Sequence, residues 1–427
     1  MNKVNIFWFR RDLRLDDNSG LRHALLSGLK VVPVFIFDKE ILDRLPHKSD
    51  RRVDYIHQAL QGIHRDLQKH NSGLYVYYGR PEEVFKKITG DFNVDTVFCN
   101  RDYEPQAIQR DLKIAGMLSE YDIRFKDFKD QVIFEKSDIL KNDGSPYTVF
   151  TPYSKKWKEN LKGIETPTTV WSHFAEYHGP SAIITLKDTG FEKTDLKFIE
   201  PVLNKEIIDF YGKYRDFPAL DHTTHLGTAL RFGTISVRRC VEYAVQHSDI
   251  WLDELIWREF FMQILFHFPD VVHHCFKKKY EQISWRNDEK EFRAWCEGKT
   301  GYPIVDAGMR ELNETGFMHN RVRMITASFL TKHLLIDWRW GEAYFAEKLL
   351  DYDLAANNGN WQWAAGCGCD AAPYFRIFNP YEQAKKFDKD HLYINKWLPE
   401  NYQEIPITEH REARERALKV YKEALAE

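Results

Sequence analysis

Two apolar stretches near the start of the chain, Val4-Asn5-Ile6-Phe7-Trp8-Phe9 and Val31-Val32-Pro33-Val34-Phe35-Ile36-Phe37, determine the predicted fold class. Short apolar runs of this kind are typical of strands that are buried on both faces of a sheet. Residues 19–29, which lie between them, have helical spacing. A strand, a helix and a second strand in succession predict a parallel sheet with helices on both faces.

The same alternation continues to about residue 130. Further strands are predicted at 74–78 and 96–98, and further helices at 51–70, 82–88 and 105–121. Parallel sheets of this type bind ligands beyond the carboxyl ends of their strands. No Gly-x-Gly-x-x-Gly motif follows the first strand, so the standard dinucleotide fingerprint is absent.

Beyond residue 130 the pattern changes. Prolines preceded by Thr or Gly interrupt residues 131–194, which we interpret as a long interdomain connection. Helical periodicity then continues almost to the end, most clearly at 254–266, 319–335 and 409–426. The sequence therefore predicts an α/β, Rossmann-like domain at 1–130, the connection at 131–194 and a large all-α domain at 195–427.

The composition excludes several classes of protein. The 427 residues include 61 Lys and Arg against 64 Asp and Glu, so binding to nucleic acid would require a local basic patch. Six cysteines without a regular framework predict reduced thiols in a cytosolic protein. Charged residues interrupt the apolar N-terminus and no apolar run is long enough for a membrane span, so we expect neither a signal peptide nor a membrane partner.

Aromatic residues make up 15% of the chain, which indicates either a large core or a site for flat ring systems. Glu254 and Trp257 lie three positions apart on one helical face. There the acid could hydrogen bond a heterocycle that stacks on the indole. A capping Glu beside a core Trp is the commoner explanation of any one such pair.

Two polar stretches are harder to explain as ordinary helix. Residues 318–324 place an amide, an arginine and a methionine on one helical face. Residues 351–363 place Asp353 and Asn357 four positions apart, among small residues and ahead of two tryptophans. Small residues permit the close approach of a flat ligand, and acids and amides could bind its edges. A capped, solvated helix end explains one of these polar residues but not the set.

Other segments leave alternatives open. The hydroxyls and backbone N–H groups of residues 222–228, ahead of a predicted helix, suit a phosphate, but an ordinary N-cap is the commoner explanation. Basic and aromatic residues alternate at 153–158 and 277–280, where they indicate either DNA phosphate contacts or a solvated charged face. Cys367 and Cys369 lack metal-ligand spacing, and we expect no bound metal.

Several of these segments, taken in order, resemble the photolyase and cryptochrome family. The resemblance covers nearly the whole chain and is closest to the class I enzymes that repair cyclobutane pyrimidine dimers. The segments that carry it are 8–18 (WFRRDLRLDDN), 257–260 (WREF), 299–307 (KTGYPIVDA), 318–328 and 353–380.

The resemblance implies a bound FAD in the helical domain. The residues that match the adenine and phosphate side are Tyr211, Thr223, Thr224, His225, Leu226, Gly227 and Thr228. Arg323 and Asp351 match the ion pair beside the isoalloxazine ring. Asp353 matches a ring or ribose contact, and Asn357 matches the amide that faces flavin N5.

The resemblance also implies a substrate site. Glu254 would hydrogen bond the dimer, and Trp257 and Trp363 would enclose its flipped-out bases. The residues that would line the same pocket or its DNA rim are Arg215, Asn320, Arg321 and Met324. The residues that match the family's electron-carrying tryptophan chain are Trp285, Trp338 and Trp361.

The chain departs from the family pattern in two places. The phosphate loop lacks a hydroxyl at Gly227, so phosphate contacts would come from Thr228 or from the backbone. Residues 366–369, Gly-Cys-Gly-Cys, replace a segment rich in Ser and Thr. The histidine characteristic of (6-4) repair is not evident at the pocket position, where Asn320 follows His319, so we disfavour (6-4) activity.

A second, antenna chromophore is expected at the switch region of the sheet, near His47, Asn100, Asp102 and Glu104. A folate, a deazaflavin or a second flavin would each suit that position, and no motif distinguishes them.

The resemblance therefore implies a monomeric, cytoplasmic lyase, associated with the nucleoid if the source is a prokaryote. Its reaction would be blue-light-driven repair of cyclobutane pyrimidine dimers in UV-damaged DNA, by electron transfer from photoexcited reduced FAD to the flipped-out dimer. The alternative is a cryptochrome-like photoreceptor without repair activity. Such receptors often carry a long polar tail, whereas this chain ends at Glu427 in a short charged helix, which favours repair.

Overall fold

The computed structural model describes residues 2–164, 170–403 and 405–426. Contacts between Cα atoms divide the chain into two compact units that interleave along the sequence. The sheet unit consists of Met1–Asp138, Asn160–Leu203 and Leu226–Gln246. The helical unit consists of Ile139–Glu159, Asn204–His225 and His247–Glu427. The predicted three-part division at residues 130 and 194 stays a prediction.

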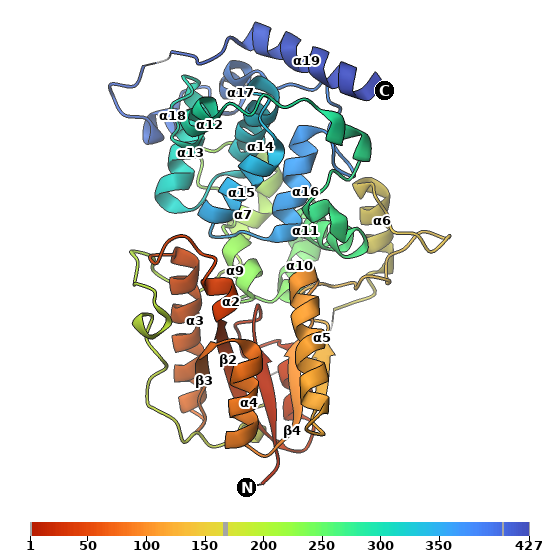
Figure 1. The fold of residues 1–427 in the computed structure, drawn as a ribbon, viewed down its shortest axis with the longest axis vertical. Helices are drawn as coiled ribbons and strands as arrows, with labels where there is room; N and C mark the ends of the chain where they lie inside the picture. The colour runs from red at the N-terminus through yellow and green to blue at the C-terminus, as the bar shows by residue number, and fades with distance from the viewer. Residues whose placement is uncertain (1, 165–169, 404, 427) are drawn as a thin grey trace. The chain divides into compact units, whose positions relative to one another are not determined.

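A five-stranded sheet forms the centre of the sheet unit (Figure 1). Its strands are β1 (Val4–Phe9), β2 (Lys30–Asp38), β3 (Tyr75–Gly79), β4 (Val94–Asn100) and β5 (Arg124–Phe128). They lie in the order β3-β2-β1-β4-β5, and every neighbouring pair is parallel. The predicted α/β class with a parallel sheet is confirmed.

Strand β1 shows why the sheet is covered on both faces. Phe7 and Phe9 belong to one apolar core, which includes Leu21 and Leu60 from helices. Ile6 belongs to the opposite core. Because successive side chains of a strand point to opposite faces, an uninterrupted apolar run must have two apolar cores to bury it.

The helices of the sheet unit follow the predicted alternation. They are α1 (Ser19–Leu25), α2 (Lys39–Leu42), α3 (Arg51–Gln68), α4 (Pro81–Asp91), α5 (Pro105–Ser119), α9 (Gly227–Phe232) and most of α10 (Val237–His247). Short 3₁₀ turns, η1 (Trp171–His173) and η2 (Lys187–Thr189), interrupt the later segment.

The helical unit contains the remaining helices. They are α6 (Phe150–Asn160), α7 (Lys205–Asp209), α8 (Tyr211–Tyr214), α11 (Asp249–His267), α12 (Glu289–Cys296), α13 (Pro303–Thr315), α14 (Asn320–Ser328), α15 (Trp338–Lys348), α16 (Leu354–Ala365), α17 (Pro380–Phe387), α18 (Leu392–Trp397) and α19 (His410–Ala426). The 3₁₀ turns η3 (Pro269–Val272) and η4 (Lys278–Gln282) follow α11. The predicted all-α character of this part is confirmed.

The continuous helix predicted at 319–335 is interrupted. Helix α14 ends at Ser328 and is followed by a π-helical turn, η5 (Phe329–His333), whose five residues are all buried. Within this turn Lys332 lies inside the unit, where its Nζ donates to the carbonyl oxygen of Ala365 at 2.8 Å. Helical periodicity alone could not reveal the wider turn.

Helix α16 lies in close contact with two neighbours at glycines. A Cβ atom at Gly359 would overlap the ring of Phe261 in α11, and one at Gly341 in α15 would overlap the ring of Trp361. These two contacts fix the position of α16, which carries much of the site described below. Across the residues that the structure describes, no helix combines the length and the apolar character that a membrane span requires.

Candidate active site

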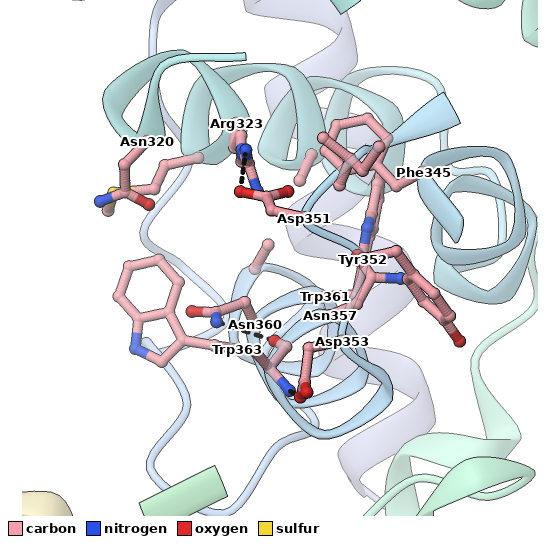
Figure 2. A pocket seen from close by; sticks show the side chains of 15 residues that line it. Asn320, Arg323, Phe345, Asp351, Tyr352, Asp353, Asn357, Asn360, Trp361 and Trp363 are labelled. Carbon is pink, nitrogen blue, oxygen red and sulfur yellow. Dashed lines mark hydrogen bonds and ion pairs between the residues drawn. The ribbon is translucent and has the colours of Figure 1, made fainter. Parts of the chain in front are cut away.

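A cavity that is partly open to solvent lies within the helical unit among α14, α15, α16 and the turn before α16 (Figure 2). Eight predicted site residues line it: Asn320, Arg323, Met324, Asp351, Asp353, Asn357, Trp361 and Trp363. The lining residues that sequence reasoning missed are Ala327, Phe345, Leu349, Tyr352, Ala356, Asn360 and Ala364.

One face of α16 forms a wall of this cavity. Asp353 caps the helix, accepting a hydrogen bond from the backbone N–H of Ala356 at 3.1 Å. The lining positions then recur at three- and four-residue intervals along the helix. Extending the spacing of Asp353 and Asn357 by further turns would have identified Ala356, Asn360 and Ala364 from the sequence.

Arg323 and Asp351 form an ion pair at the cavity. The Nη2 atom of Arg323 lies 2.9 Å from Oδ2 of Asp351, and its Nε donates to the carbonyl oxygen of Met318 at 2.7 Å. Figure 2 shows the pair as a dashed line. The other carboxylate oxygen of Asp351, Oδ1, is buried and has no hydrogen-bond partner among the described residues. A buried acceptor without a partner is costly, so the site favours a ligand with an N–H donor.

The side-chain amide of Asn357 is hydrogen bonded to Glu342 in α15. Its Nδ2 donates to the backbone oxygen of Glu342 at 3.1 Å and to Oε1 of the same residue at 2.8 Å. Burial raises the pKa of Glu342. Because both amide hydrogens are directed at Glu342, the carbonyl oxygen is the group that Asn357 can offer to a ligand. Glu342 lies on another helix, and no local spacing could have indicated it.

Four other predicted residues, Tyr211, Arg215, Glu254 and Trp257, do not line the cavity. Arg215 donates to Glu254, and its guanidinium lies 5.3 Å from the ring centroid of Tyr211. Burial raises the pKa of Glu254, and the charge of Arg215 acts in the opposite direction. Trp257 stacks on Phe150 with ring centroids 3.7 Å apart and an interplanar angle of 4°. Phe150, on α6, gave no signal in the sequence.

Arg321 lies between an acid and an aromatic ring. Its Nη2 donates to Asp216 at 2.7 Å, and its guanidinium lies 4.3 Å from the ring centroid of Phe387. Its Nε is buried without a partner among the described residues. The side chain therefore lies outside the cavity lining, although its neighbour Asn320 is part of it.

The three predicted electron-carrying tryptophans belong to one packed region. Trp361 and Trp338 are buried members of the same apolar core, and the partly buried Trp285 packs against it. Trp361 also makes an edge-to-face contact with Phe345, with ring centroids 4.9 Å apart. The assignment of electron transfer to these residues stays a prediction.

The predicted phosphate loop is divided between the two units. Thr223, Thr224 and His225 belong to the helical unit, and Leu226, Gly227 and Thr228 to the sheet unit. Helix α9 begins at Gly227, and its N-cap residue Leu226 makes no side-chain capping hydrogen bond. The ordinary side-chain N-cap is therefore not the explanation of these hydroxyls. Phosphate binding by the loop stays a prediction.

The predicted antenna residues lie in the sheet unit. Asn100 donates to Asn18 and accepts from the backbone N–H of Gly20, both at 2.8 Å. Asp102 accepts from the backbone N–H of Tyr103 at 2.7 Å. Glu104 accepts from Arg11 and Arg231, each at 2.6 Å, and His47 is exposed. An antenna site here stays a prediction. No cluster of three potential metal ligands occurs among the described residues.

Two family models match the chain. Residues 5–171 match the model described as DNA photolyase, and residues 251–414 match the FAD binding domain of DNA photolyase. A deoxyribodipyrimidine photo-lyase of Synechococcus is 38% identical over 426 residues, which cover 92% of this chain and 87% of the relative. The predicted enzyme class and FAD cofactor are thereby confirmed.

Solved structures share the whole fold. A class III photolyase from Agrobacterium tumefaciens has a TM-score of 0.88 at 33% identity, covering 100% of this chain and 98% of its own. An archaeal photolyase from Sulfolobus tokodaii, described with two FAD molecules, has a TM-score of 0.86 at 36% identity, covering 98% and 100%. A cryptochrome from Synechocystis has a TM-score of 0.85 at 25% identity, covering 98% and 99%. The chain belongs to the DNA photolyase and cryptochrome family, as the sequence segments predicted.

Proposed function

We propose that this protein is a light-driven lyase that repairs cyclobutane pyrimidine dimers in UV-damaged DNA. The observation that carries the proposal is the cavity of the helical unit, which brings together eight residues selected from the sequence for contact with flavin, dimer or electron path. Full-length relatives named deoxyribodipyrimidine photo-lyase support the same reaction.

The residues of the cavity fit a flavin ring. The unpartnered Oδ1 of Asp351 requires an N–H donor, which the edge of an isoalloxazine ring provides. Arg323 holds the other oxygen of that carboxylate, so the acceptor is fixed in place. Ala356 and Ala364 leave room for a flat ring beside α16. When bound and reduced, the flavin supplies the electron that blue light makes available.

The protein's part in the reaction is to extract the dimer and hold it. A base must leave the DNA stack before a buried cofactor can act on it. Trp363 at the cavity and Trp257 outside its lining would replace the lost stacking, at about 1–3 kcal/mol per base. The Glu254 carboxyl, with its raised pKa, and the adjacent Arg215 would place hydrogen-bond donors and positive charge beside the dimer.

Light-dependent repair tests the proposal. Purified protein, reduced and illuminated with blue light, is mixed with an oligonucleotide that contains one cyclobutane thymine dimer, and dimer loss is followed against a dark sample. We expect restoration of both thymines in the light alone. Bound, photoreducible FAD without any repair would contradict the proposal and favour the cryptochrome-like alternative, whose fold is the same.

A second substrate tests the dimer specificity. An oligonucleotide with one (6-4) photoproduct, treated in the same way, is expected to remain unrepaired. Repair of the (6-4) product at a comparable rate would show that Asn320 does not define the pocket as we propose.

The remaining proposals concern the oligomeric state of the protein and its antenna chromophore. We propose a monomer, which light scattering of the purified protein tests directly. We also propose an antenna chromophore in the sheet unit, and mass spectrometry of small molecules released from the protein would identify a folate, a deazaflavin or a second flavin. The two FAD molecules described for the Sulfolobus relative support the last of these.

A further inference from the structure

Two consecutive residues of opposite charge, Arg215 and Asp216, follow helix α8, and each forms an ion pair with a different helix. Arg215 donates to Glu254 of α11. Asp216 accepts from Arg321 of α14, whose Nη2 lies 2.7 Å from its Oδ1. All four residues belong to the helical unit. Three of them are predicted contacts of the dimer or its DNA rim, and Asp216 is not.

The Arg321 guanidinium has a single acceptor oxygen among the residues that the structure describes, and Asp216 supplies it. Its Nη1 lies 3.7 Å from the sulfur of Met324, and its Nε has no partner in the same part of the chain. One face of the guanidinium lies 4.3 Å from the ring centroid of Phe387. Most of its N–H donors are therefore not bonded to oxygen.

The pair between Arg321 and Asp216 is accessible to solvent. The side chain of Asp216 is 40% exposed and that of Arg321 is 18% exposed. Water and salt screen an ion pair of this kind, which therefore contributes little to stability. An anion that reaches Arg321 from solution can replace the carboxylate at a correspondingly small cost.

The segment that carries Asp216 has other attachments. The backbone N–H of its neighbour Arg215 donates to the carbonyl oxygen of Tyr211 at 2.9 Å. The guanidinium of Arg215 is paired with Glu254. A change of partner at Arg321 would therefore leave this segment in place.

Arg321 lies next to the cavity, because its neighbour Asn320 and Met324, almost one turn further along α14, both line it. A dimer that enters the cavity stays joined to phosphodiesters on both sides, because flipping rotates a nucleotide about its own backbone. Each phosphodiester presents oxygens that share a negative charge, as a carboxylate does, and arginine binds both groups in the same way. The donors of Arg321 therefore suit either partner.

We propose that Asp216 holds, in the free protein, the position at Arg321 that a DNA phosphate takes when damaged DNA binds. The phosphate replaces the carboxylate, so that Arg321 exchanges one ion pair for another and no covalent bond changes. Asp216 then lies beside the phosphate and repels it. It is therefore an intramolecular competitor that lowers the affinity for DNA. The choice of DNA as the ligand rests on the proposed function.

Binding in the dark tests the proposal on the FAD-loaded protein. Asp216→Asn keeps the size of the side chain and removes its charge. Fluorescence anisotropy at several salt concentrations measures the affinity for a labelled oligonucleotide that contains one cyclobutane thymine dimer. We expect the variant to bind roughly 2- to 5-fold more tightly than the wild-type protein, because the competing carboxylate is gone.

The salt dependence of binding gives a second readout. In the wild-type protein, the displaced Asp216 carboxylate takes up a cation from solution, which offsets one counterion released from the DNA. The variant has no such carboxylate. The slope of log affinity against log salt should therefore be steeper in Asp216→Asn by up to about 0.9.

Two further variants make the result specific. Asp221→Asn removes the same charge from a nearby carboxylate that pairs with His225 at 2.7 Å instead of with an arginine, and it should change the affinity less. In an Arg321→Gln background, Asp216→Asn should give no further gain. An equal gain in Asp221→Asn, a gain that persists in Arg321→Gln, or no gain in Asp216→Asn would each overturn the proposal.

The outcomes separate this inference from the proposed function. The binding experiment uses no light, so a failure of repair does not affect its result. Equal affinity of the wild-type protein for damaged and undamaged DNA would contradict the proposed function. A gain in Asp216→Asn that requires Arg321 would even then support the exchange with a phosphate.

Discussion

Two carboxylates that pair with arginines, one in each unit, differ in how completely their oxygens are hydrogen bonded. In the sheet unit, Asp130 accepts from Arg14 at 2.7 Å, from Arg238 at 2.7 Å and from the backbone N–H of Ser19 at 3.1 Å. In the helical unit, Asp351 accepts from Arg323 through one oxygen and leaves the other without a partner. A fully hydrogen-bonded ion pair serves the fold, whereas an incompletely bonded one at a cavity is available to a ligand.

The electrostatics of Asp130 agree with a purely structural role. Burial opposes its ionisation, yet Arg14 and Arg238 together lower the pKa of this carboxyl below its usual value. Its side chain is 1% exposed, against 18% for Asp351. The two sites therefore predict different consequences when the acid is removed.

The largest effect is expected from Asp130→Ala. The substitution removes the carboxylate that Arg14 and Arg238 share, and breaking a buried pair costs about 3–5 kcal/mol. Urea unfolding of the purified protein measures the loss. A change below about 1 kcal/mol would show that the sheet unit does not depend on this pair.

Asp351→Ala should instead affect the cofactor. It removes the acceptor for the flavin edge and the partner of Arg323. A hydrogen bond to a charged group contributes about 1.5–3 kcal/mol, so retention of FAD should weaken roughly 10- to 150-fold. Flavin absorbance after dialysis gives the occupancy, and Asp390→Ala, an exposed acid of the same unit, is the matched control. Full occupancy in Asp351→Ala would refute the assignment.

Trp363→Ala should reduce binding of the damaged site. Loss of one stacking face corresponds to about 1–3 kcal/mol, or roughly 5- to 150-fold in affinity for DNA that contains one dimer. Binding of undamaged DNA should not change, because stacking on a flipped base makes no contribution there. Trp171→Ala, a partly exposed tryptophan of the sheet unit, provides the control. Equal losses for damaged and undamaged DNA would contradict the role of Trp363.

The smallest effect concerns a second incompletely bonded group, which lies away from the cavity. His333 is fully buried, its Nε2 lies 2.8 Å from Nδ1 of His410, and its Nδ1 has no partner among the described residues. Burial and the adjacent His410 lower the pKa of His333 to about 3 from 6.5. The folded state thus favours the neutral ring.

This shift predicts a specific dependence on pH. The stability contributed by neutral His333 is present above pH 6.5 and is lost as the pH falls towards 3. Between pH 7.5 and 5.5 the loss is about 1.4 kcal/mol, and His333→Leu should not show it. Urea midpoints of both proteins at the two pH values measure the difference. The same decrease in both would mean that His333 does not carry this dependence.

The hydrophobic pattern of the sequence predicted most of the strands and helices in each unit. The apolar runs at 4–9 and 31–37 predicted β1 and β2, because strands buried on both faces have continuous apolar sequence. Strand β5 was missed because it lies at the edge of the sheet and three of its five residues, 124–128, are charged. The π-helical turn after Ser328 was missed because it keeps a helical apolar pattern.

In the candidate site, too, residues that share one face of a helix could be predicted, whereas residues that meet a partner on another element could not. Arg323 and Asn357 could be selected because each lies on a helix whose spacing brings polar residues to one face. Glu342 and Phe150 could not, because each meets its partner across different elements of the fold. Such pairings follow from tertiary packing, which no spacing within one segment records.

The π-helical turn η5 constrains how the length of the chain can change. A π turn holds one residue more than an α turn, so deletion of one residue from 329–333 would allow an ordinary α-helix through this segment. Because the π turn holds the extra residue within a single turn, the segments before and after it would keep nearly their present relative orientation. Lys332, which lies inside the turn, would instead be displaced from the carbonyl oxygen of Ala365, whereas Arg323, which precedes the turn, would keep Asp351. Among relatives that keep the Lys332 contact, insertions and deletions should therefore fall outside residues 329–333.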